Sequence, residues 1–261
     1  MKKESKKTIY AKHGINLING KLESPIGLIN PVLINGNAKL GKGVWTFSTL
    51  AGTVIYKAIV NGMDMNVRGT CACDCVGCYA KTGFFRMSST INSLALKTVL
   101  AREYVDFLKR AILAQIEADK IETIRIHASG DFVSDAYAQM WLEIAKEKPL
   151  VRFWTYTKIA KYENLFSTLE NANIVKSIIP GMGLNYGHID YIKSTFDKLE
   201  SDGKAVHICR CGIDKNQHCT NCKGCATNEY VLFVEHSTDY KPEKENNWEE
   251  FKRFVESKSE K

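Results

Sequence analysis

The sequence predicts an α/β fold, a partial or full (βα) barrel with a β-rich extension over residues 1–60 and a cysteine-rich insertion at 207–227 inside the barrel domain 61–261. Strand-like and helix-like segments alternate after residue 88, which is the pattern of parallel βαβ units. The chain has 261 residues, of which 44% are hydrophobic, so it can bury a substantial core. All nine cysteines lie in two short windows, which points to a bound metal centre.

The first part of the chain, residues 8–60, contains short β-type segments separated by turn signals at Asn19-Gly20 and Asn35-Gly36. Thr46–Tyr56 is a further apolar stretch. Residues 89–119 then carry apolar side chains at helical spacing, and we expect one long helix there.

Beyond residue 119, strand and helix patterns alternate along the chain. We expect strands at 122–128, 150–157, 173–180, 204–209 and 229–236, and helices at 134–147, 160–170, 188–201 and 248–257. Strands joined through helices pair in parallel, so their C-terminal ends share one edge of the sheet. Polar and glycine segments follow these strands, and we expect them to meet at that edge together with both cysteine windows.

Composition excludes several classes of protein. Charged residues make up 25% of the chain, there are five prolines, and no apolar run approaches 18 residues, which argues against a disordered chain and against a membrane-spanning one. The basic N-terminus is followed by no signal-peptide pattern, so we expect a cytoplasmic protein with no membrane partner. The net charge of +7 favours an anionic partner such as nucleic acid, although terminal lysines that aid solubility account for much of it.

The cysteines are the most informative residues. The first window holds Cys71, Cys73, Cys75 and Cys78, and the second holds Cys209, Cys211, Cys219, Cys222 and Cys225. An odd total and close spacing argue against a disulfide framework, whereas clustered thiolates in a reducing compartment are typical of zinc or iron-sulfur binding.

Within the first window, Cys71, Cys75 and Cys78 form a C-x3-C-x2-C pattern that precedes the first long helix. This pattern, in this position, resembles the radical S-adenosylmethionine (radical SAM) superfamily. The resemblance implies a barrel of radical SAM type in which three thiolates hold three irons of a [4Fe-4S] cluster. The fourth iron stays open for S-adenosylmethionine, whose reductive cleavage by a donated electron starts radical chemistry on a substrate.

The resemblance also implies where S-adenosylmethionine binds. Ser129, Gly130 and Asp131 follow the second barrel strand, where the superfamily has a glycine-rich acidic motif for the ammonium group. Lys158 at a strand end could contact a carboxylate or phosphate, and Asn185 could line the pocket. Tyr79 lies one residue after the position where the superfamily places an aromatic residue, which here is Gly77.

The chain also resembles a phage-associated family called gene product 88. The segments that carry this resemblance are residues 70–83, 127–131 and 156–158. The resemblance covers roughly residues 45–236 and implies no particular reaction. One alternative stays open in the first window, because Cys73 could replace a ligand, or could close the site as a fourth ligand of a structural zinc.

The second window ends in a C-x2-C-x2-C run, Cys219, Cys222 and Cys225, which is typical of [4Fe-4S] sites. Cys209 or Cys211 could supply the fourth ligand. The window resembles the auxiliary clusters of radical SAM enzymes, while a four-thiolate zinc site is the competing interpretation. The sequence therefore predicts a radical SAM-type enzyme with a reducing electron donor and an unknown substrate, for which a nucleotide or nucleic acid is one candidate. The alternative is a non-catalytic nucleic-acid-binding module stabilised by zinc or iron-sulfur centres.

Overall fold

The computed structural model describes residues 4–36, 40–72, 78–176, 186–210, 213–214, 217–220, 222, 224–234 and 242–259. Its main sheet has the strand order β10-β9-β8-β5-β4. The strands are β4 (Ile34–Asn35), β5 (Val44–Phe47), β8 (Thr123–Ile126), β9 (Arg152–Thr157) and β10 (Ala172–Lys176). The predicted parallel pairing is confirmed for β8, β9 and β10; β5, which was not among the predicted parallel strands, also pairs in parallel with β8, and β4 is antiparallel at the edge. The sheet therefore takes strands from inside the expected N-terminal extension.

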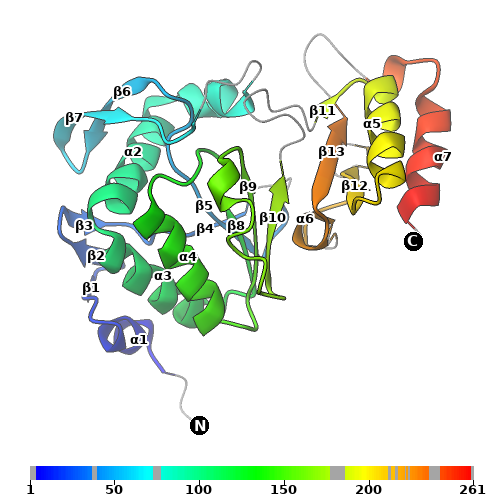
Figure 1. The fold of residues 1–261 in the computed structure, drawn as a ribbon. Coiled ribbons are helices and arrows are strands. Elements are labelled where there is room, and N and C mark those ends of the chain that lie inside the picture. Colours follow the sequence, from blue (N-terminus) through cyan, green and yellow to red (C-terminus); the bar gives the residue numbers. More distant parts are fainter. Residues whose placement is uncertain are drawn as a thin grey trace.

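The two faces of this sheet have different neighbours, because successive side chains of a strand point to opposite faces. Phe47, Ile124 and Phe153 belong to the main core with helices α3 (Val105–Asp119) and α4 (Asp135–Glu147). Trp154 packs on the other face beside Cys219 and Cys225. Figure 1 shows α3 and α4 on one side of β8 and β9, with the short helix α6 (Gly224–Thr227) next to β10.

The region expected to form one long helix, residues 89–119, is instead two helices. α2 (Ser88–Glu103) ends at Tyr104, whose backbone has φ −134° and ψ 48°, and α3 begins at the next residue. Leu94 and Val99 of α2 pack with the hairpin of β6 (Ile55–Val60) and β7 (Met63–Arg68), whereas Leu100 near the end of α2 and Leu108 of α3 both pack in the main core. The apolar periodicity runs through the break, so the sequence pattern alone gave no sign of it.

The N-terminal part contains a helix as well as strands. α1 (Lys6–Lys12) begins after Ser5, whose hydroxyl accepts a hydrogen bond from the Thr8 backbone N–H. An antiparallel three-stranded sheet follows, made of β1 (Leu17–Ile18), β2 (Lys21–Ser24) and β3 (Gly27–Ile29), and the hairpin is made of β6 (Ile55–Val60) and β7 (Met63–Arg68). No described helix combines the length and the apolar character needed to cross a membrane.

The C-terminal part has its own sheet and its own core. The parallel strands β11 (Tyr186–Gly187), β13 (Tyr230–Val234) and β12 (Val206–Ile208) lie in that order, packed against helices α5 (Ile189–Ser201) and α7 (Trp248–Ser259). The backbone N–H of Lys176, the last residue of β10, donates to the carbonyl of Glu229 beside β13, which links the two sheets.

Two further comparisons concern the predicted elements. The helix expected at 160–170 is only a 3₁₀ turn, Ala160–Tyr162, followed by other turns. Tyr162 and Phe166 of this segment nevertheless pack in the main core. The strands described here form an open arrangement of small sheets with no closed barrel among them, so the architecture shown is mixed α/β. The radical SAM-type barrel stays a prediction.

Candidate functional site

The first candidate site lies where β5 and β8 end. The backbone N–H of Thr49, just after β5, donates to the Ser129 carbonyl at 3.0 Å, so the two loops lie side by side. Thr70 joins them: its backbone N–H donates to the Leu50 carbonyl at 2.9 Å, and its hydroxyl accepts from the Asp131 backbone N–H at 2.9 Å. The Thr49 and Thr70 hydroxyl oxygens are also 2.9 Å apart. The segment that leads into Cys71 is thereby fixed beside Ser129, Gly130 and Asp131.

Two glycines make this close approach sterically feasible. Gly130 has φ +82°, and a Cβ there would lie 2.0 Å from Thr49 Oγ1 and 2.7 Å from Thr70 Oγ1. A Cβ on Gly69 would lie 2.3 Å from the Gly52 carbonyl oxygen. Real Cβ atoms do not approach other atoms so closely, so both positions require glycine for this packing.

Asp131 is buried, and its carboxylate is engaged within the protein. One oxygen accepts hydrogen bonds from the Phe132 backbone N–H and the Thr157 hydroxyl, both at 2.8 Å, and the other accepts from the Lys158 backbone N–H at 3.0 Å. Burial raises the pKa of Asp131, and these hydrogen bonds oppose that shift. The predicted residues Asp131 and Lys158 are therefore brought together, with Asp131 holding the end of β9 against the loop after β8.

His127 precedes this loop in a left-handed conformation, φ +60°, which is uncommon outside glycine. Its Nε2 lies 2.9 Å from the Tyr137 hydroxyl and its Nδ1 lies 3.3 Å from the Thr155 hydroxyl. Burial lowers the pKa of His127 to about 3, with the Arg125 charge acting in the same direction. The imidazole is therefore neutral at pH 7 and serves as a hydrogen-bonding group in the core.

Lys97 of α2 is a residue that sequence reasoning missed. Its side chain is 4% exposed, and its Nζ lies 5.8 Å from the ring centre of Phe47, the last residue of β5. Within the described part of the chain no carboxylate pairs with it, and burial lowers its pKa to about 8. A lysine in an apolar helical stretch gives no sequence signal of burial, because lysine is normally exposed.

The remaining predicted residues of this site are only partly described. Cys71 and Cys78 are partly exposed, and the Cys71 backbone N–H donates to the Gly52 carbonyl at 3.2 Å. Tyr79 begins a 3₁₀ turn, Tyr79–Lys81. Cys75, Asn185 and the side chain of Tyr79 lie outside the described residues.

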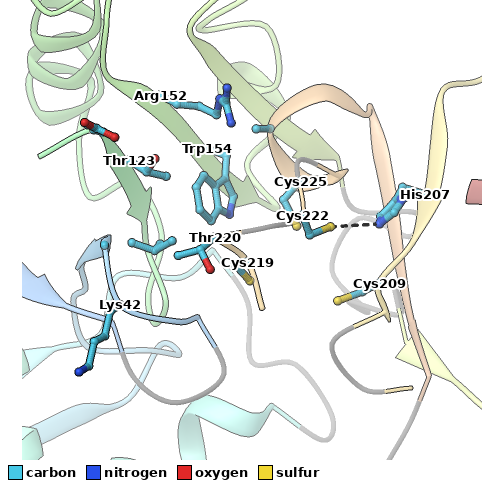
Figure 2. Close-up of a pocket in the computed structure, with 14 residues that line it drawn as sticks. Lys42, Thr123, Arg152, Trp154, His207, Cys209, Cys219, Thr220, Cys222 and Cys225 are labelled. Atoms are coloured by element: carbon cyan, nitrogen blue, oxygen red, sulfur yellow. Dashed lines mark hydrogen bonds between the residues drawn. The ribbon is translucent and has the colours of Figure 1, made fainter. Parts of the chain in front are cut away.

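A second candidate site is a cavity of about 220 Å³ on the other face of the main sheet (Figure 2). Five potential metal ligands line it, and they are His207, Cys209, Cys219, Cys222 and Cys225. The first residues of three main-sheet strands, Val44, Thr123 and Arg152, also line it. The prediction that both cysteine windows meet at the C-terminal edge is therefore wrong for the second window, because its chain folds back over the strand starts.

Hydrogen bonds position the sulfurs of this second window. The Tyr156 hydroxyl lies 2.8 Å from Cys225 Sγ, and His207 Nε2 lies 3.6 Å from Cys222 Sγ. Asn173 of β10 donates through its amide to the Cys225 and Asn228 carbonyls, both at 2.9 Å, which fixes α6 on the sheet.

Burial disfavours the thiolate form of both Cys225 and Cys222. Burial raises the pKa of Cys225 to about 12, and burial also raises the pKa of Cys222, against which the Gly224 backbone N–H acts. Among the described residues, no three His, Cys, Asp or Glu side chains are grouped so that they could hold a metal ion. The thiols instead surround a cavity, and Cys211 lies outside the described part.

Comparison with known proteins gives one family. Residues 31–236 match the family model described as Gene product 88. The chain is 27% identical over 159 residues to the Gene 88 protein of Mycobacterium phage L5, covering 52% of this chain and 62% of that protein. It is 31% identical over 120 residues to the Gene 88 protein of Mycobacterium phage D29, covering 41% of this chain and 45% of that protein. The match thus spans about half the length of these relatives, and no solved structure matches the chain.

Proposed function

The chain belongs to the gene product 88 family, and we propose that within this family it is an iron-sulfur enzyme of radical SAM type. The observation that carries the proposal is the position of Cys71. It follows Thr70, whose hydroxyl is hydrogen-bonded to the backbone N–H of Asp131 at the C-terminal edge of a parallel sheet. Chemistry in α/β folds concentrates at this edge.

The donor set fits a cluster with one open corner. Cys71, Cys75 and Cys78 would hold three irons, and the open iron would take the amino and carboxylate groups of S-adenosylmethionine. When bound, the reduced cluster would supply the electron that cleaves the sulfonium carbon-sulfur bond. Cys71 and Cys78 are both partly exposed.

The residues of the chain would position this site and bind its ligand. Thr49 and Thr70 fix the start of the cysteine loop, and Gly130 allows the loop after β8 to approach them. Ser129, Gly130 and Asp131 would orient S-adenosylmethionine, with Lys158, Tyr79 and Asn185 around them.

The second window would hold a second [4Fe-4S] cluster or a zinc ion through Cys209, Cys219, Cys222 and Cys225. Cys211 is the alternative to Cys209 as the fourth ligand. The surplus of 36 Lys and Arg over 29 Asp and Glu favours an anionic substrate such as a nucleotide or nucleic acid.

The test is anaerobic reconstitution of the full chain with iron and sulfide, followed by dithionite and S-adenosylmethionine. We expect brown protein and release of 5′-deoxyadenosine. The Cys75→Ala chain should release none, while Cys73→Ala, the matched control within the same loop, should keep most of the release.

Two results would overturn the proposal. A colourless chain that binds zinc but neither iron nor sulfide would favour a zinc-stabilised nucleic-acid-binding module. Loss of release in Cys73→Ala with retention in Cys75→Ala would mean that the three ligands are assigned wrongly.

A further inference from the structure

We propose that Cys209, Cys219, Cys222 and Cys225 bind a redox-active iron-sulfur cluster, and that Tyr156 and His207 are positioning residues that donate hydrogen bonds to two of its ligand sulfurs and raise its reduction potential. The inference rests on the second centre of the proposed function. Beyond that function, the metal centre is a cluster and not zinc, and two residues that are not ligands act on it.

Three elements bring the four sulfurs to one cavity. Cys209 directly follows β12, Cys219 and Cys222 lie in the loop that follows, and Cys225 lies in α6. Strand alternation places His207 and Cys209 on the same face of β12, opposite Ile208, which packs in the C-terminal core. Figure 2 shows the labelled sulfurs around the cavity, with Cys209 set apart from Cys222 and Cys225.

The arrangement of the thiols along the chain favours a cluster over a single ion. Cys219, Cys222 and Cys225 form the C-x2-C-x2-C run typical of [4Fe-4S] sites, and together with Cys209 they line a cavity of about 220 Å³. In a [4Fe-4S] cluster each iron takes one protein thiolate, so four cysteines around one cavity would supply a full ligand set.

The imidazole of His207 is seated against the cysteine loop at a glycine. A Cβ on Gly224 would lie 2.1 Å from His207 Cδ2 and 2.4 Å from Nε2, so the ring occupies the space that any other residue would fill. This seat places Nε2 3.6 Å from Cys222 Sγ, and the Gly224 backbone N–H lies 3.4 Å from the same sulfur. A cluster-bound Cys222 thiolate would carry no proton, so His207 Nε2–H and the Gly224 backbone N–H would both donate to its sulfur.

The ring of Tyr156 is held in place from several sides. The Arg125 guanidinium lies 5.4 Å from its ring centre, and the Phe233 ring centre is 6.0 Å away. The hydroxyl lies 2.8 Å from Cys225 Sγ. A cluster-bound thiolate carries no proton, so Tyr156 would be the donor in that hydrogen bond.

These contacts predict an effect on redox chemistry. Reduction adds one negative charge to the cluster and its thiolates, and a donor at a ligand sulfur stabilises the more negative state. A merely structural role for Tyr156 or His207 would leave the reduction potential unchanged, so the potential distinguishes the two roles.

The experiment isolates the second centre by using the full chain with Cys71, Cys75 and Cys78 all replaced by alanine. This background is reconstituted with iron and sulfide, and its midpoint potential is measured by EPR-monitored titration. We expect about four irons per chain, as one cubane requires. Tyr156→Phe and His207→Leu should each weaken reduction by about tenfold in its equilibrium constant, a midpoint lower by about 59 mV for one electron.

Matched controls keep the result specific. Tyr230→Phe removes a hydroxyl from a partly exposed tyrosine of β13, and His13→Leu removes an imidazole that pairs with Glu117 far along the chain; neither should move the midpoint. His207→Gln, which keeps a donor, should restore part of the shift. Unchanged midpoints in both Tyr156→Phe and His207→Leu, or cluster loss in both, would overturn the role of these residues.

Failure of the proposed function has a different signature. Zinc in place of iron in this background would refute the cluster assignment while leaving S-adenosylmethionine cleavage by the first window to be judged separately. Conversely, a tuned cluster in a chain that releases no 5′-deoxyadenosine would support this inference and contradict the proposed enzyme.

Discussion

Replacing Gly130 by alanine tests whether the packing of Thr49, Thr70 and Asp131 stabilises the fold at the first site. The residue has φ +82°, and a left-handed conformation costs a residue with a side chain about 1–2 kcal/mol. The new Cβ would also lie 2.0 Å from Thr49 Oγ1 and 3.0 Å from the Thr49 carbonyl oxygen, so the loop must shift. The backbone strain alone would occur at any such glycine, whereas the collision is specific to this one.

The cost of the shift follows from the hydrogen bonds that it would break. Thr70 bridges the Thr49 hydroxyl and the Asp131 backbone N–H, each at 2.9 Å and both buried. Leaving a buried donor or acceptor unsatisfied costs about 1–3 kcal/mol. With the backbone term, Gly130→Ala should lower the free energy of unfolding by about 2–5 kcal/mol, a large share of the 5–15 kcal/mol typical of a domain.

Urea unfolding followed by circular dichroism measures this, and Gly203→Ala is the matched control. Gly203 has φ +69° with nothing within 4 Å of a built Cβ, so alanine there should cost only about 1–2 kcal/mol. Equal losses at the two positions would refute the argument that close packing against Thr49 and Thr70 matters.

Two further predictions concern buried polar groups. Burial lowers the pKa of Lys97 from 10.5 to about 8, so the unfolded chain binds its proton more tightly and the stability contribution rises between pH 8 and pH 10.5. Lys97→Met should therefore raise the unfolding free energy at pH 7 by about 1–3 kcal/mol and flatten that rise; equal stability of wild type and variant at pH 7 would contradict it. Asn173→Ala removes two hydrogen bonds, one to Cys225 in α6 and one to Asn228 just after it, and should cost about 1–3 kcal/mol and speed hydrogen exchange at 224–228. The partly buried Asn247, whose amide donates to Asp190, gives the control Asn247→Ala. Slow exchange in both variants would show that α6 is held by other contacts.

The spacing of apolar residues was sufficient to predict the helices and strands that bury one regular face. The expected helix at 134–147 corresponds to α4, and the expected strand at 150–157 corresponds to β9, because each presents one regular apolar face to the main core. The expected helix at 89–119 is wrong because the backbone leaves the helical conformation at Tyr104, while apolar side chains continue at helical spacing on both sides of that residue. The α1 helix was missed although Ser5 and Thr8 carry a capping signal.

The candidate sites divide in the same way. The sequence was sufficient to find the cysteines of the second cavity and the loop Ser129, Gly130 and Asp131 beside Thr70. The residues of each group are close together in the chain, so a local motif reveals them. The contacts of Tyr156 with Cys225 and of Asn173 with α6 join residues more than fifty positions apart. Only the fold brings such pairs together, so no local signal exists for them.

Strand β9 contributes to both sites through its alternation. Thr155 and Thr157 reach His127 and Asp131, while Trp154 and Tyr156 face the cysteine cavity. A one-residue insertion or deletion ahead of this strand would exchange the two sets of side chains. An insertion or deletion of one residue before β9 would therefore disturb both candidate sites at once. Substitutions are the changes that this strand can accept at one site without altering the other.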